Sequence, residues 1–292
     1  MVHSLRTRRP AAGFTLVELL VVVIIIGILA ALLIPTINAA RNAARRTVIA
    51  LELSQLESAL EEYKSKNGGD YPPDWTNPQF VKDHLGRAFP RHDRAVAATW
   101  IDTQNNPANP TNGTWKIDPA EALVFWLSMV KTDVRYPLTS STSSTNKFYD
   151  FDQTRLKDID GDGFMEYYPK GVDRAPYVYF NWRTYGNTAA PYGAVYPYAT
   201  TFVGHAGITG LGEARPYGDL VNAGVTRFNA PQKFQIISTG LDGEYGGPTA
   251  FPSPGYKIAP GKPTPSGANL TKGDQDNLTS FSEGKTIEAL QP

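Results

Sequence analysis

The sequence predicts an α+β fold, in which one long N-terminal helix packs against a small antiparallel sheet with large loop insertions. Residues 19–34 form a run of 16 residues without a charged side chain, and an apolar stripe at helical spacing continues over residues 37–63. Residues 177–182 and 234–238 are rich in aromatic and β-branched side chains, which is typical of strands. These segments indicate a helix first and a sheet-bearing head after it.

The apolar run is long enough to cross a membrane. Counted from Phe14 it reaches about 21 residues, close to the roughly 20 that a spanning helix needs. Glu18, near its start, is ionisable, and a charge at membrane depth costs roughly 2.5–3.5 kcal/mol or more and needs a partner. Arg6, Arg8 and Arg9 precede the run, so the positive-inside rule predicts a cytoplasmic N-terminus and a periplasmic head.

Two simpler interpretations each account for part of this pattern. A secretory signal peptide has a shorter apolar segment and is cut after it, at a small-residue site. Here the run is longer, and Pro35 and a resumed helical pattern follow it. A plain transmembrane anchor fits the length but gives no partner for Glu18.

Residues 13–18 read Gly-Phe-Thr-Leu-Val-Glu and lead into the apolar run and Pro35. This stretch resembles the cleavage and methylation motif of type IV pilins and type II secretion pseudopilins. The resemblance implies that a prepilin peptidase cuts between Gly13 and Phe14, and that the new Phe14 amine is N-methylated and stays cationic. It also implies that Glu18 neutralises the Phe14 amine of a neighbouring subunit during assembly.

A second stretch of resemblance lies where the long helix is expected to end. Tyr63, followed by Asn-Gly-Gly-Asp-Tyr-Pro at residues 67–72, is similar to the helix exit of the major pseudopilins. Glycine supplies a left-handed C-terminal cap, and proline prevents the helix from continuing. The expected pilin-like organisation is a leader peptide (1–13), a transmembrane half of the helix (14–36), an amphipathic half (37–67) and a periplasmic globular head (68–292).

Within the head, residues 78–88 are expected to form a short helix. A second helix should begin at Asp118, because Asp118, Pro119 and Glu121 suit the N-cap, first and third positions. Residues 185–230 are rich in Gly, Tyr and Pro, and a loop of that length in a compact domain is often functional.

One candidate metal site has three carboxylates at alternate positions. Asp158, Asp160 and Asp162 are followed by Gly163, and Glu166 stands at the ninth place of the motif. The pattern matches the first half of a D-x-D-x-D-G calcium loop, but Pro169 occupies the twelfth place, where an EF-hand has glutamate. The sequence therefore predicts a calcium site that is not an EF-hand, and the alternative is a solvated acidic turn.

The second candidate is split between two segments near the C-terminus. Residues 238–247 resemble the Ser-x-Gly-x-Asp-Gly stretch of the major pseudopilins, a family that places a structural calcium in the following loop. The resemblance implies that Asp274 and Asp276 are ligands, with Asp242 nearby and backbone carbonyls completing the shell. The insertion at 248–272 departs from the family, which leaves the ligand set open, and hydrated loop carboxylates are the alternative.

Composition argues against several other classes of protein. The chain carries 28 basic and 28 acidic residues, and loss of the leader removes three arginines, so no basic surface for nucleic acid is expected. There are no cysteines, which excludes disulfides and thiol chemistry. We expect no enzyme activity, because the histidines are few and lack metal or triad spacing: His3, His84, His92 and His205.

The expected function is that of a structural subunit of a type II secretion pseudopilus or type IV pilus-like filament. The expected partners are further copies of the chain in a homo-oligomeric filament, prepilin peptidase, an inner-membrane assembly platform and membrane lipid, with calcium stiffening the C-terminal loops. The subunit would wait in the inner membrane as a single-pass protein before entering a filament at the cell surface. The rival is a minor or tip pilin that recognises glycan or secreted protein through residues 185–230.

Overall fold

The computed structural model describes most of the chain in two compact units, Met1–Ala44 and Arg45–Pro292. The described residues are 15–104, 117–129, 133–138, 147–159, 161–185, 211–222, 225–246, 257–258 and 271–290. Gly13, Phe14, Asp160 and much of the 185–230 segment lie outside them.

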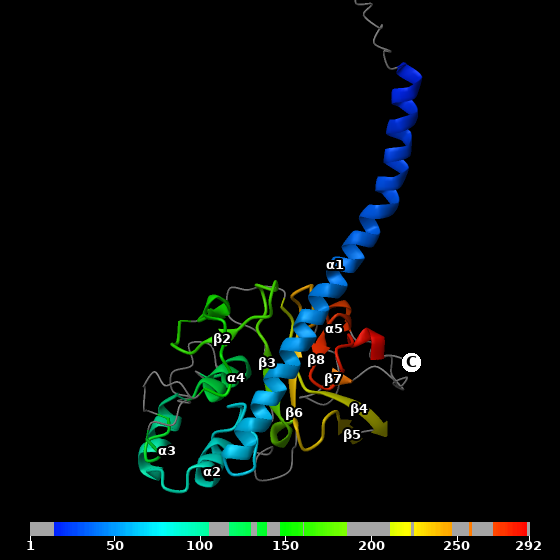
Figure 1. Ribbon diagram of the computed structural model, residues 1–292. Coiled ribbons are helices and arrows are strands. Elements are labelled where there is room, and N and C mark those ends of the chain that lie inside the picture. Colours follow the sequence, from blue (N-terminus) through cyan, green and yellow to red (C-terminus); the bar gives the residue numbers. More distant parts are fainter. Residues whose placement is uncertain are drawn as a thin grey trace, which may run out of the picture. The chain divides into compact units, whose positions relative to one another are not determined.

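The first unit contains the N-terminal part of helix α1, which runs from Leu16 to Lys66 and continues through Pro35 (Figure 1). Its large apolar side chains over residues 16–34 are between 46% and 80% exposed. Of the helices in the described ranges, α1 is the one long and apolar enough to cross a membrane. Because apolar side chains point outward on every side, this part of α1 needs an apolar surrounding.

Among the residues that the structure describes, the second unit contains the rest of α1, four shorter helices and eight short strands. The helices are α2 (Pro78–Ala88), α3 (Arg94–Gln104), α4 (Pro119–Ser128) and α5 (Lys272–Gln275). The 3₁₀ turns are η1 (Gln153–Arg155), η2 (Trp182–Thr184) and η3 (Glu288–Leu290). The strands are β1 (Leu156–Lys157), β2 (Glu166–Tyr167), β3 (Val178–Asn181), β4 (Tyr217–Asn222), β5 (Val225–Phe228), β6 (Phe234–Ser238), β7 (Lys257–Ile258) and β8 (Leu278–Thr279).

The strands form small sheets, and the α+β prediction is confirmed. The central sheet has the order β3-β6-β8 and is antiparallel throughout, and β1 pairs with β2 in a separate two-stranded ladder. The third sheet has the order β5-β4-β7, in which β4 and β7 run parallel. The two strands expected from composition, at 177–182 and 234–238, are β3 and β6, and they pair with each other.

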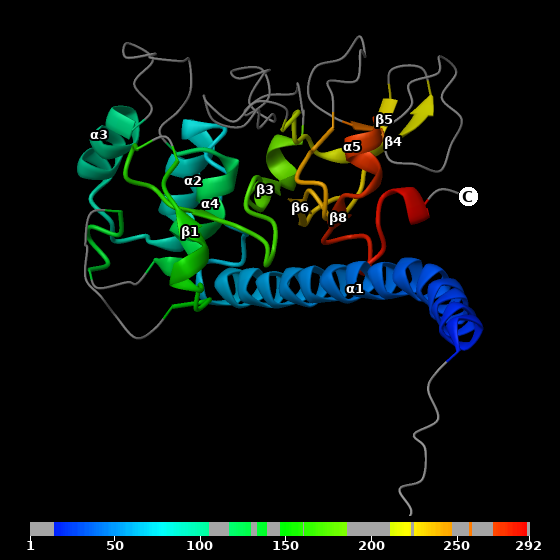
Figure 2. The same ribbon diagram turned by 90° about the horizontal axis from the view of Figure 1, so that it is seen from above.

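The central sheet, α2 and α4 lie on one side of the C-terminal part of α1 (Figure 1, Figure 2). The face of α1 that meets them recurs every three or four residues, through Ile49, Leu53, Leu56, Leu60 and Tyr63, each at most 3% exposed. Val48 and Leu51 also fall within the apolar stripe that the sequence predicts over residues 37–63, but this part of the prediction was wrong, because they are 41% and 60% exposed. A strict helical period counted back from Tyr63 selects Ile49 and Leu53 instead.

Helix starts follow the sequence closely. Asn77 caps α2 by accepting from the backbone N–H groups of Gln79 and Phe80. Asp118 caps α4 and forms a reciprocal capping box with Glu121, as the sequence predicted. These local signals set where each helix begins, and burial of their apolar faces then decides how they pack.

The buried Glu52 carboxylate on α1 accepts hydrogen bonds from three side chains that are distant in the sequence. Glu52 is 8% exposed, and it accepts hydrogen bonds from Arg155 on both oxygens, one of them at 2.9 Å. It also accepts from the hydroxyl groups of Tyr167 at 2.8 Å and Tyr177 at 2.7 Å. Burial and the Glu52 charge raise the pKa of both tyrosines, so each hydroxyl stays a donor at neutral pH. This network fixes η1, β2 and the start of β3 against α1.

Replacement of Glu52 should therefore destabilise the second unit strongly. Glu52→Gln removes the charge opposite Arg155, and the loss from breaking a buried ion pair is about 3 kcal/mol. The change is measured by urea unfolding of the full chain in detergent. Glu62→Gln is the control, because Glu62 lies on the same helix in an exposed pair with Lys66, whose loss should change stability by less than about 0.5 kcal/mol. Equal effects of the two variants would contradict this role of Glu52.

A neutral histidine sits in the aromatic core between α1, α2 and α4. His84 is fully buried, its Nε2 lies 2.9 Å from the Tyr63 hydroxyl, and its ring packs against Trp126. Burial lowers the pKa of His84 to about 3, with the charges of Asp70, Arg87 and Arg183 making smaller contributions of both signs. His84 therefore stays neutral in the folded chain well below its ordinary value of 6.5.

Because His84 is neutral when folded, the free energy of unfolding should fall at acid pH. The unfolded chain binds a proton on His84 near pH 6.5, and the folded chain resists it until about pH 3. The stabilisation that comes from keeping His84 neutral is fully present above pH 6.5 and is lost as the pH falls toward 3. The free energy of unfolding falls by on the order of 4 kcal/mol in all over this range. In Tm measurements on the full chain across this range, His84→Gln should show a shallower decline than the parent. His92→Gln, outside this cluster, should keep the parental slope, and parallel slopes for all three chains would refute the assignment.

Candidate functional site

In the first unit, Glu18 and Thr15 form a reciprocal cap at the start of α1. The Thr15 N–H and hydroxyl donate to Glu18 Oε2 at 2.9 Å and 2.8 Å, and the Glu18 N–H donates to the Thr15 hydroxyl at 3.2 Å. This is a capping box, and its Thr-x-x-Glu signal was missed in the sequence analysis. Glu18 thus has a structural role within one chain, and its carboxylate is exposed.

Glu18 has no ion-pair partner of opposite charge among the residues that the structure describes. Gly13 and Phe14, the expected processing residues, lie outside those residues. The roles of Gly13, Phe14 and Glu18 in cleavage, methylation and assembly therefore stay predictions at this point. The Glu18 carboxylate lies at the N-terminus of α1, where the helix dipole favours a negative charge.

The first calcium candidate is a tight turn whose carboxylates accept from its own backbone. Asp158 accepts from the N–H groups of Gly161 at 2.8 Å and Gly163 at 3.1 Å, and Asp162 accepts from Phe164 N–H at 2.8 Å. Glu166 is in β2 and fully buried, where it accepts from the Tyr168 hydroxyl at 2.8 Å. Asp160 lies outside the described residues. The described part is an acidic turn, and calcium binding there stays a prediction.

The second calcium candidate brings Asp242 and Asp276 close to each other. Burial and the Asp276 charge raise the pKa of Asp242 to about 6. Asp242 accepts from the Glu244 N–H at 2.9 Å. Asp276 accepts from Arg46 at 2.5 Å and from the Leu241 N–H at 2.6 Å. Both Asp276 oxygens therefore already have donors.

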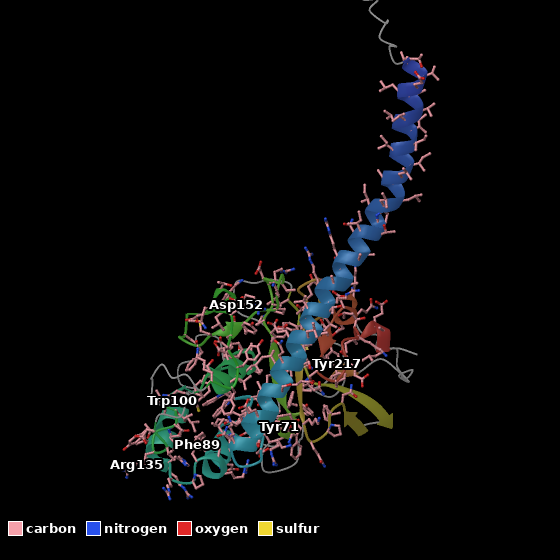
Figure 3. The ribbon with its side chains drawn as sticks, in the orientation of Figure 1. Tyr71, Phe89, Trp100, Arg135, Asp152 and Tyr217 are labelled. Carbon is pink, nitrogen blue, oxygen red and sulfur yellow. The ribbon has the colours of Figure 1, made fainter. Side chains whose placement is uncertain are left out.

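Asp274, which we expected to be a calcium ligand, accepts hydrogen bonds from protein groups on both oxygens. It is fully buried, and one oxygen accepts from the Thr271 N–H and hydroxyl in the capping box that starts α5. The other oxygen accepts from the hydroxyl of Tyr217, labelled in Figure 3, at 3.2 Å. These bonds explain why a carboxylate is buried here without a metal ion being required.

The acidic side chains of this second site do not form a metal-binding cluster in the described ranges. Calcium takes 6–8 oxygen ligands, and no three acidic, His or Cys side chains in the described ranges gather closely enough to hold a metal ion. One neighbouring acceptor, Asn277 Oδ1, is buried without a hydrogen-bond partner among those residues, but a single neutral oxygen does not complete the set. Calcium at Asp242, Asp274 and Asp276 stays a prediction.

Two charged residues of α1 were missed in the sequence analysis, Arg46 and Glu52. Glu52 has a readable signal, since it lies three residues after Ile49 and one before Leu53 and therefore falls on the buried face. Arg46 has no such signal, because its partner is 230 residues away in the sequence.

Comparison with known proteins decides the family. Residues 8–34 match the prokaryotic N-terminal methylation motif. Over 104 residues the chain is 43% identical to the type II secretion system core protein G of Pseudomonas aeruginosa, covering 34% of this chain and 72% of that protein. The chain belongs to the type II secretion system core protein G family. This membership confirms the resemblance seen in the N-terminal motif.

Other members of the core protein G family and a related pilin match a shorter part. The core protein G of Klebsiella michiganensis is 42% identical over 60 residues, or 20% of this chain and 42% of that protein. The type IV wide pilus major component PilA4 of Thermus thermophilus is 49% identical over 59 residues, or 20% of this chain and 45% of that protein. No solved structure matches the chain. Most of this head therefore lies outside these matches.

Proposed function

We propose that the chain is a structural subunit of a type II secretion pseudopilus or a related type IV pilus-like filament. One observation carries the proposal: residues 16–34 of α1 are exposed and apolar on every side, they lie within the matched methylation motif, and Glu18 is their one charged residue. Exposed apolar surface of this extent needs lipid or other apolar helices around it. The names of the relatives, a secretion core protein and a major pilus component, support the same function.

The proposed sequence of events begins in the inner membrane, with the leader in the cytoplasm and the head in the periplasm. Prepilin peptidase cuts between Gly13 and Phe14, and the Phe14 amine is methylated while it keeps its positive charge. An assembly platform then transfers the subunit from lipid to the filament. Packing of apolar α1 segments against each other replaces their contacts with lipid, so the apolar area stays covered throughout.

Glu18 would direct the order of assembly. A carboxylate surrounded by apolar helices is unfavourable unless an opposite charge neutralises it. The Phe14 amine of a neighbouring subunit is a cation at the same end of the helix, so each added subunit satisfies the carboxylate of another. Within one chain, the Glu18 side chain bonds to Thr15, which keeps the helix start ordered until that partner arrives.

The Glu18→Gln variant tests the charge of Glu18 separately from its capping hydrogen bond to Thr15. Glutamine also serves at the third position of a capping box, so the variant keeps the bond to the Thr15 N–H and loses only the charge. We expect unchanged amounts of the variant in the membrane fraction and loss of most of the subunit from sheared filaments. The measurement is the ratio of filament to membrane protein by immunoblot.

Thr15→Ala is the matched control, because it removes the capping hydroxyl and leaves the Glu18 charge in place. That variant should still assemble. Normal filament yield from Glu18→Gln would refute the charge-pairing account, and loss of assembly from Thr15→Ala alone would show that helix capping rather than charge is the requirement.

A further inference from the structure

The C-terminal loops of the head contact each other and α1 without a disulfide, because the chain has no cysteine. Two segments meet here, residues 239–246 and residues 271–279. Gly240 has φ of 65°, and a Cβ at this position would lie 2.1 Å from the Asp276 carbonyl oxygen and 2.6 Å from its Oδ2. The two segments are therefore in backbone contact, and only glycine allows it.

Asp276 is the centre of that contact. Its Oδ2 accepts from the Leu241 N–H at 2.6 Å, which joins the two loops. Its Oδ1 accepts from the Arg46 guanidinium at 2.5 Å, which joins the loops to α1. The Asp276 side chain is 16% exposed and that of Arg46 is 43% exposed, so the pair is partly shielded from water. The two oxygens of the Asp276 carboxylate thus accept from two different parts of the head, helix α1 and the loop at residues 239–246.

The other acidic residue of the α5 turn is already satisfied by neutral donors. Asp274 accepts from Thr271 and from Tyr217, and the Tyr217 hydroxyl itself accepts from Asn277 Nδ2 at 2.8 Å. This arrangement leaves Asp276, together with the nearby Asp242, as the negative charge that needs a cation. Arg46 supplies one at hydrogen-bonding distance from Asp276.

We propose that Arg46 is the cation that fastens the C-terminal loops of the head to α1, so that the fastening needs no calcium. The guanidinium is charged at every physiological pH, and its planar group suits a carboxylate oxygen. A calcium ion at Asp276 would compete with Arg46 for the same carboxylate, and the two cations would repel each other. The order of these loops is then independent of the calcium concentration around the cell.

The proposal and the predicted calcium site give opposite expectations for one experiment. The full chain is purified in detergent, and Tm is measured by circular dichroism in EGTA and again with millimolar calcium chloride. For the parent chain we expect the same Tm in both solutions. For Arg46→Met, which keeps the apolar stem of the side chain but loses the charge, we expect Tm to fall by about 4 °C or more in both solutions, since Asp276 loses its cation.

Arg45→Gln is the matched control. Arg45 is the preceding residue on the same helix and is exposed, so this variant removes one positive charge and should leave Tm near the parental value. A second variant, Asp276→Asn, should lower Tm by an amount that does not add to that of Arg46→Met, because both remove the same interaction.

Two results would overturn the proposal. The first is a fall of the parental Tm in EGTA that calcium reverses and that persists in Asp158→Asn, a variant of the other predicted calcium site, since this would show that a metal ion fastens the loops. The second is an Arg46→Met chain that is no less stable than Arg45→Gln. An unchanged parental Tm in EGTA supports the proposal even if a variant does not fold.

Discussion

One helix has to satisfy two different surroundings along its length, and the rest of the structure follows from that constraint. In the first unit α1 is apolar and exposed on all sides, which suits lipid or a bundle of like helices. In the second unit the same helix buries one face, from Ile49 to Tyr63, against a sheet and two helices. Because α1 belongs to both units, Glu18 near its start and the residues that fix the head lie on one continuous helix.

Charged side chains on α1 supply the specific contacts of the head. Glu52 bonds to Arg155 and two tyrosines, and Arg46 bonds to Asp276, across sequence separations of 103 and 230 residues. Apolar burial drives the packing but does not choose one arrangement among similar ones. A buried carboxylate with three matched donors does select one packing arrangement, because any shift of these elements would leave charged or polar groups unpaired.

The elements of this fold were largely readable from local sequence, and the candidate sites were not. The start of α2 at Pro78, the Asp118 cap and strand β6 at 234–238 depend on neighbouring residues, so local rules find them. The acidic motifs are different, since a carboxylate can bind a metal, a backbone N–H or an arginine. Which of these Asp276 uses depends on Arg46, which is 230 residues away, and one oxygen of Asp274 likewise depends on the hydroxyl of the distant Tyr217.

The N-terminus of the mature protein tests the central claim most directly. Protein extracted from the inner membrane and from sheared filaments is digested, and its first peptide is identified by mass spectrometry. The account predicts that the peptide begins at Phe14 and carries one added methyl group on its amine. A mature chain that begins at Met1, or one that begins after the apolar run, would contradict the account, because no cationic Phe14 amine would exist to meet Glu18 of another subunit.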